Sequence, residues 1–93
     1  MRLSDFMLST QELDPAMPLY FESGSHEVPV SALTPTSSQL ILNLTGNQTP
    51  LTLGQLRAQV KALPGRLRLY VQQATGDHLI LGYRLTQNHL LLG

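Results

Sequence analysis

An apolar pattern that occurs twice, 50 residues apart, constrains the fold of this chain more than any other feature. In the second half it runs through residues 51–70, LTLGQLRAQVKALPGRLRLY, which read as a capped helix, a stop and a strand. One helical face recurs in both halves: Leu3, Phe6, Thr10 and Leu13 correspond to Leu53, Leu56, Val60 and Leu63. A helix of this length is marginal alone, so each copy needs a sheet beneath its apolar face.

The two helices differ in their start and stop signals. Thr52 and Gln55 fit a capping box, in which each side chain accepts from the other residue's backbone N–H. Pro64-Gly65 then ends the second helix. Ser4 is the expected N-cap of the first helix, and Asp14-Pro15 is its expected end. The apolar stripes could bind a partner helix, but packing in the core accounts for them without one.

Three strands follow each helix. Alternating apolar residues predict them at residues 17–22, 27–33 and 40–42 and again at 67–72, 78–85 and 90–92. Pro29 has no amide donor, so its strand should lie at an edge or carry a bulge. The third strands are apolar on both faces, which indicates that both are covered on both sides.

We therefore predict an α+β fold made of two tandem repeats, each a helix followed by a three-stranded meander (αβββ). Repeat 1 covers residues 1–44, a polar linker covers 45–50, and repeat 2 covers 51–93. Neither repeat could bury enough surface alone, so residues 1–93 should form a single domain. This pseudo-two-fold domain would have about six strands and two helices, with its two sheets stacked face to face or joined edge to edge.

Composition excludes several classes of protein. The chain has no cysteine, so it has neither a disulfide framework nor a thiolate metal site. An apolar content of 42% with 13% charged residues is typical of a globular protein. No apolar run approaches the roughly 18 residues of a membrane-spanning helix, and residues 1–20 do not resemble a signal peptide. We expect a cytoplasmic protein.

The charges divide the chain into opposite halves, although the net charge is zero. Residues 1–50 carry −4 and residues 51–93 carry +4. Three explanations remain open: the unlike charges help the two halves pack together, they drive self-association, or the basic half binds an acidic partner or nucleic acid. The residues that would make such contacts are Arg57, Lys61, Arg66, Arg68, Tyr70 and Arg84.

The residues of known catalytic and metal-binding patterns do not occur here at the required spacing. His26, His78 and His89 lack partners at metal-ligand spacing, and the glycines form no phosphate-binding loop. Nothing marks a serine nucleophile with its base and oxyanion hole. We therefore expect no cofactor, no metal and no enzymatic activity.

Three functional hypotheses follow from these observations. The first is a non-enzymatic protein-interaction module that acts on a protein partner or forms a homodimer through its acidic and basic halves. The second is binding of nucleic acid or another anionic ligand by the basic half. The third is a small enzyme with a site between the repeats, holding Tyr20, Tyr70, Arg68 or His78.

The start of the second repeat also carries a family likeness. Leu51–Leu56 reads LTLGQL, and Leu63-Pro64 ends the helix ahead of an apolar strand. In these features residues 51–92 resemble small uncharacterised bacterial and phage-encoded domains with the pattern LTxGEL…LP, here in tandem duplicate. Gln55 stands where those domains more often have Glu. The resemblance implies no activity, cofactor or active-site residue.

Overall fold

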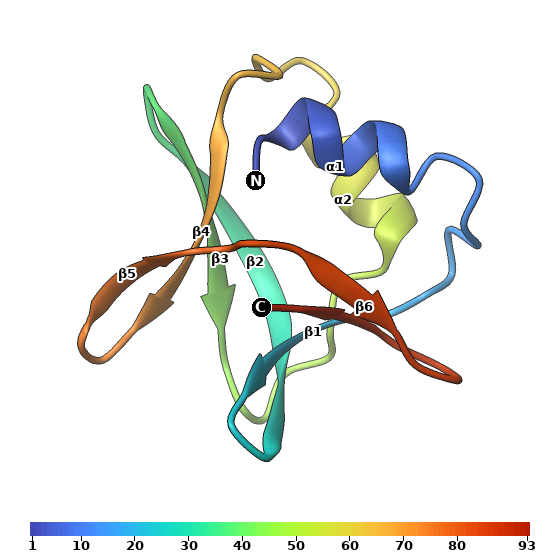
Figure 1. Ribbon diagram of the computed structural model, residues 1–93, viewed down its shortest axis with the longest axis vertical. Coiled ribbons are helices and arrows are strands. Elements are labelled where there is room, and N and C mark those ends of the chain that lie inside the picture. Colours follow the sequence, from blue (N-terminus) through green and yellow to red (C-terminus); the bar gives the residue numbers. More distant parts are fainter.

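The computed structural model describes residues 1–93, which form two helices and seven strands (Figure 1). The helices are α1 (Leu3–Ser9) and α2 (Leu53–Val60). The strands are β1 (Leu19–Ser23), β2 (His26–Pro35), β3 (Gln39–Leu44), β4 (Arg68–Gln73), β5 (Gly76–Leu79), β6 (Tyr83–Leu85) and β7 (Leu90–Leu92). The predicted α+β class is confirmed, and neither helix has the length and hydropathy of a membrane-crossing segment.

All seven strands belong to one curled sheet in the order β5-β4-β3-β2-β1-β7-β6. The expected count of six strands is wrong, because the segment 78–85 is divided into β5 and β6. Ile80 N–H still donates to the carbonyl of Leu69 in β4, at 2.9 Å. The amides of Leu81 and Gly82 instead donate to the Gly93 carbonyl, at 2.8 and 3.1 Å. The chain therefore moves from one neighbouring strand to another within three residues.

The two predicted meanders join edge to edge through their third strands. Strand β3 pairs in parallel with β4, with Leu40 opposite Leu69. Strand β7 pairs in parallel with β1, with Leu90 opposite Leu19. Each half of the chain therefore supplies a strand that completes the sheet of the other half. Both third strands lie inside the sheet order, as their apolar composition predicts.

The two helices lie together on one side of the curled sheet (Figure 1). The predicted apolar stripes face the core: Leu3 and Phe6 of α1 are buried, as are Leu53, Leu56 and Val60 of α2. The strands and the β5–β6 connection contribute the other side of the core, from Leu19, Phe21, Val30, Leu40, Leu42, Leu69, Val71, Ile80, Leu90 and Leu92. Burial of these side chains provides the main stabilisation of the fold.

The helix ends confirm one predicted cap and correct another. Thr52 and Gln55 form the capping box, at 3.2 Å for Gln55 N–H to Thr52 Oγ1 and 2.9 Å for Thr52 N–H to Gln55 Oε1. Ser4 is not an N-cap, because α1 begins at Leu3 and Arg2 stands in the cap position. The Leu3 and Ser4 amides instead donate to the carbonyls of Leu67 and Gly65, so this helix start is satisfied by distant backbone.

Turn chemistry and proline account for the hairpins. Gly24 and Gly76 have φ of +59° and +119°, which a glycine adopts without steric cost. Strand β2 carries a bulge between Val30 and Ala32, directly after Pro29, as the missing amide of that proline predicts. Helix α2 ends at Val60, four residues before Pro64, and a turn follows it.

Candidate functional site

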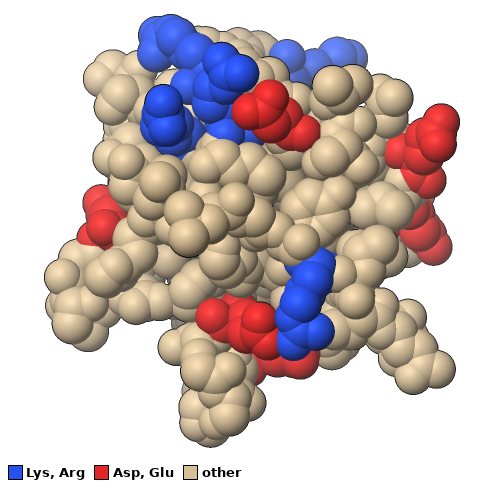
Figure 2. Space-filling model, in the orientation of Figure 1, with Lys and Arg blue, Asp and Glu red and all other residues tan.

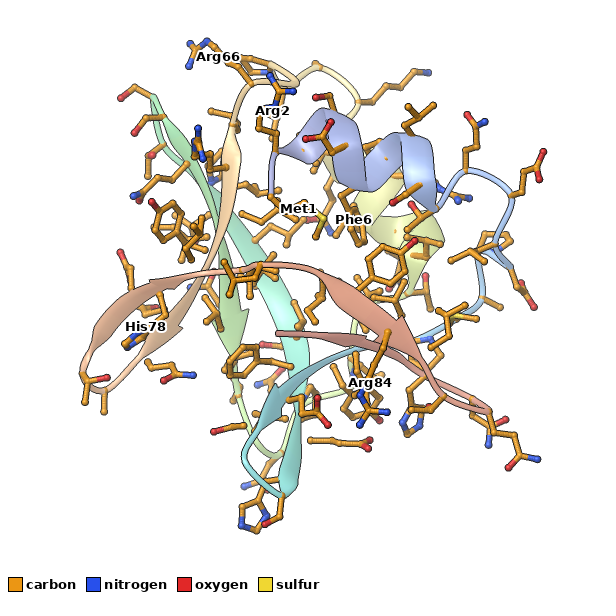
Figure 3. All side chains as sticks on the ribbon, viewed as in Figure 1. Met1, Arg2, Phe6, Arg66, His78 and Arg84 are labelled. Atoms are coloured by element: carbon orange, nitrogen blue, oxygen red, sulfur yellow. The ribbon has the colours of Figure 1, made fainter.

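Three arginines gather where α1 and β4 begin. Arg2 and Arg68 form an isolated antiparallel bridge through their backbones, and Arg66 lies two residues before Arg68. All three residues are exposed. Figure 2 shows blue atoms collected over this end of the molecule, and Figure 3 places Arg2 and Arg66 there together. We call Arg2, Arg66 and Arg68 the arginine cluster.

Two contacts restrain the arginine cluster. Arg66 donates from a terminal nitrogen to the Ser37 carbonyl in the β2–β3 turn, at 2.9 Å. Arg2 pairs with Asp5 across one turn of α1, with Nε to Oδ2 at 3.3 Å. Arg68 has no side-chain ion pair. The cluster therefore presents three guanidinium groups and one compensating carboxylate, and sequence analysis missed Arg2 because it belongs to the acidic half of the chain.

Arg57, predicted to contact an anionic partner, is used inside the fold. Its terminal nitrogen donates to the Thr10 carbonyl and links α2 to the end of α1. Thr10 is itself buried, and its hydroxyl donates to the Phe6 carbonyl at 2.7 Å. Arg57 therefore secures one helix to the other and does not belong to the arginine cluster.

Lys61 and Tyr70 were also predicted to contact an anionic partner. Lys61 is exposed and follows the last residue of α2. Tyr70 is half-buried on the outer face of β4, opposite Ile41 on one side and Leu79 on the other. Because side chains alternate along a strand, Tyr70 and Arg68 project from the same face of β4.

Arg84 lies on a different part of the surface, paired with Glu22 (Figure 3). Arg84 Nε donates to Glu22 Oε1 at 3.2 Å, and a terminal nitrogen donates to Glu22 Oε2. The hydrogen bond from Arg84 holds the pKa of the Glu22 carboxyl below its ordinary value. The same hydrogen bond raises the pKa of Arg84. Arg84 is therefore committed to a partner within the chain and is separate from the arginine cluster.

A second contact between the halves lies close to this ion pair. His89 Nδ1 is 3.0 Å from Glu27 Oε1, and the His89 ring packs on Tyr20 with a centroid distance of 4.3 Å. The Arg84–Glu22 pair joins one of the five bases of residues 51–93 to an acid of residues 1–50, and the His89–Glu27 contact joins an imidazole to another of these acids. Part of the charge division is therefore used to join the two halves, which was one of the three explanations for it.

One hollow of about 190 Å³ opens on the surface beside the Arg84–Glu22 pair. The lining combines two charged side chains, which bond each other, with Tyr83, Leu91 and two glycines. The residues are Glu22, Gly82, Tyr83, Arg84, Leu91 and Gly93. This lining contains no histidine, serine, threonine or cysteine side chain.

The residues predicted for an enzyme site between the repeats are not among those that line the hollow. Tyr20 is stacked on His89, and Tyr70 lies on β4. Arg68 belongs to the arginine cluster, while the His78 Nε2 atom is 2.8 Å from the Thr75 hydroxyl at the β4–β5 turn. The structure therefore distributes these four residues over several elements.

Comparison with protein-family models, curated proteins and solved structures finds no match for this chain. Two features of the structure bear on function: the arginine cluster, whose charge is only partly compensated, and the hollow, whose charged groups are paired with each other.

Proposed function

We propose that this protein is a non-enzymatic interaction module that binds an acidic surface of a protein partner through the arginine cluster. The observation that carries the proposal is the convergence of Arg2, Arg66 and Arg68 with only Asp5 as a charged partner. Guanidinium groups are suited to this role because each presents a planar fork of donors that matches a carboxylate. They also remain charged at every physiological pH.

The geometry favours docking over loose charge attraction. The hydrogen bond from Arg66 to the Ser37 carbonyl limits the motion of one guanidinium. The Arg2–Arg68 bridge fixes the distance between the backbones from which the other two arginine side chains project. Pre-organised donors lose less conformational entropy when they bind. The expected partner is therefore a surface with two or more exposed carboxylates at similar spacing.

A second copy of the chain is one such partner. Glu12 and Asp14 are exposed in the α1–β1 connection, which runs along the right side of Figure 1. A head-to-tail contact would bring this acidic connection of one copy to the arginine cluster of the next. Light scattering at low and high salt tests this form of the proposal, and a monomer at every concentration and salt would remove it.

Single-stranded nucleic acid is the alternative ligand. It is favoured by Tyr70, which shares the outer face of β4 with Arg68 and could stack on a base. A phosphate chain would be held by the same guanidiniums. The two ligands are distinguished by the response to Tyr70→Leu, which should weaken nucleic-acid binding and leave carboxylate binding unchanged.

Fluorescence anisotropy with a labelled polyglutamate peptide and a labelled single-stranded DNA tests the proposal. At low salt, wild type should bind polyglutamate, and the double variant Arg66→Gln/Arg68→Gln should bind at least about tenfold more weakly. The matched control is Arg84→Gln, which removes another exposed arginine, one outside the cluster, and should have little effect. Equal binding by wild type and the double variant would overturn the proposal.

We also infer that the fold arose by tandem duplication of the αβββ unit. Support comes from pairs of hydrogen bonds related by the same shift of 50 residues: Leu3 N–H to the Leu67 carbonyl corresponds to Leu53 N–H to the Met17 carbonyl. The isolated bridges Arg2–Arg68 and Thr52–Pro18 correspond in the same way. A chain made of residues 51–93 twice, joined by residues 45–50, should then fold cooperatively, and failure of this chain to fold would count against duplication.

A further inference from the structure

The segment from β5 to β6 holds three of the four large apolar side chains that are exposed. Leu79 is 38% exposed, Leu81 is 79% exposed and Leu85 is 47% exposed, while the fourth, Leu8, lies on α1. All four residues of β5 are exposed, and the hairpin β4–β5 projects at the left of Figure 1. Leu79 lies on β5, Leu81 in the connection that follows it, and Leu85 on β6. Exposed leucines that follow one another along the two outer strands favour a surface that a partner covers.

The backbone of β5 has one unpaired edge. Strand β5 is the last strand of the sheet and pairs only with β4. Ile80 N–H donates to the Leu69 carbonyl, and paired and unpaired positions alternate along an antiparallel ladder. Gly76 and His78 therefore face β4, whereas the N–H and C=O groups of Asp77 and Leu79 face away from it. These groups are free to bond another strand.

The corresponding hairpin β1–β2 is not at an end of the sheet, because β2 has β1 and β3 as neighbours and β1 has β2 and β7. Pro29 lies opposite Tyr20 in that hairpin, just as Leu79 lies opposite Tyr70 in β4–β5. Pro35 likewise lies opposite Leu40, as Leu85 lies opposite Leu90. Proline has no N–H to offer to an added strand. Strand β2 therefore lacks this donor at two positions, whereas Leu79 in β5 and Leu85 in β6 retain it.

We infer that the free edge of β5 binds an extended segment of a protein partner by strand addition. Strand β7 runs antiparallel to β6, and the residue after it, Gly93, bonds Gly82. A partner segment that lies beside β5 in line with β7 would therefore run antiparallel to β5. Backbone bonds to Asp77 and Leu79 would hold the segment, and alternate side chains would set its specificity.

The side chains of β5 specify the chemistry of this segment. Leu79 and Asp77 project on one face because they are two residues apart, together with Tyr70 opposite Leu79. A partner residue opposite Leu79 would be apolar, and one opposite Asp77 would be Lys or Arg. An antiparallel segment passes Leu79 before Asp77. Its motif is therefore an apolar residue, then any residue, then a basic residue. This site is independent of the arginine cluster, which would repel a basic segment.

A capped peptide of alternating valine and threonine, with lysine two places after its central valine, provides the test. Its addition to wild type should slow hydrogen exchange of the Asp77 and Leu79 amides, measured by ¹H–¹⁵N NMR. Leu79→Pro should fold, because Pro29 occupies the matching position, and should bind the peptide at least about tenfold more weakly. Leu8→Ser is the matched control and should bind as wild type does.

A charge exchange keeps the inference testable if Leu79→Pro fails to fold. Asp77→Lys should weaken binding of the lysine peptide and strengthen binding of the same peptide with glutamate in that position. Arg66→Gln/Arg68→Gln should leave binding of the lysine peptide unchanged. Failure of polyglutamate binding at the arginine cluster can therefore be distinguished from failure of peptide binding at the edge of β5. No protection of Asp77 and Leu79 in wild type, or equal binding of both peptides by wild type and Asp77→Lys, would overturn the inference.

Discussion

Ser4 and Gly65 lie so close that a β-carbon added to Gly65 would stand 2.9 Å from the Ser4 β-carbon. The Ser4 amide also donates to the Gly65 carbonyl at 2.9 Å, which holds the start of α1 against the segment before β4. Gly54 and Pro15 meet in a similar way, with an added β-carbon 3.1 Å from the Pro15 β-carbon. These two contacts bring the backbone of each half against the helix start of the other.

The Gly65 contact predicts a specific steric coupling. Gly65→Ala should lower the free energy of unfolding by about 1–3 kcal/mol, because neither backbone can withdraw without losing the Ser4–Gly65 hydrogen bond. Adding Ser4→Gly removes the opposing β-carbon and should recover part of that loss. Denaturant unfolding of the two single variants and the double variant measures the coupling. Strictly additive effects would show that the two residues do not collide.

The capping box of α2 predicts a difference between two similar substitutions. Thr52→Ala removes a side chain that accepts from the Gln55 N–H and should cost about 1 kcal/mol in the free energy of unfolding. Ser4→Ala is the control, because the Ser4 side chain caps no helix and the residue is exposed. Its effect should stay within about 0.5 kcal/mol. A larger loss from Ser4→Ala than from Thr52→Ala would contradict the assignment of the caps.

The Arg84–Glu22 pair predicts a dependence of stability on pH. The pKa of Glu22 is lowered in the folded protein by the hydrogen bond from Arg84, so folding favours the ionised carboxyl. The stabilisation is present above the ordinary carboxyl pKa of about 4.5 and is lost as pH falls through the lower folded-state pKa. It should be small, since both side chains are solvent-exposed.

Urea unfolding of wild type and Arg84→Met across this acidic range measures the effect. The two midpoints should differ at neutral pH and converge at low pH, because the protonated carboxyl no longer benefits from the arginine. Arg68→Met serves as the control, since Arg68 has no ion pair and its substitution should shift the midpoint by the same amount at each pH. A wild-type advantage that grows as pH falls would contradict the assignment.

Local signals in the sequence were enough to predict much of the fold. The spacing of Leu53, Leu56 and Val60 identifies a buried helix face, and Thr52 with Gln55 identifies its start, because both depend on residues within two turns. The division of residues 78–85 into β5 and β6 was missed. It depends on bonds to Gly93, and no signal within the segment shows where the strand changes partner.

The candidate site was predicted only in part for a similar reason. Arg66 and Arg68 are close in sequence, so their shared location could be expected. Arg2 joins them through pairing with β4, and Arg84 leaves them through its bond to Glu22. Both contacts join residues more than 60 positions apart, and the net charge of each half does not determine which residues meet.

The most direct test of the central claim is a ¹H–¹⁵N NMR titration of wild type with polyglutamate at low salt. We predict saturable shifts concentrated at Arg2, Arg66, Arg68 and Ser37, whose carbonyl accepts from Arg66. These shifts should shrink as salt is added, since exposed charge contacts are screened. Shifts centred instead on Arg84 and the hollow, or an absence of saturable shifts, would contradict the central claim.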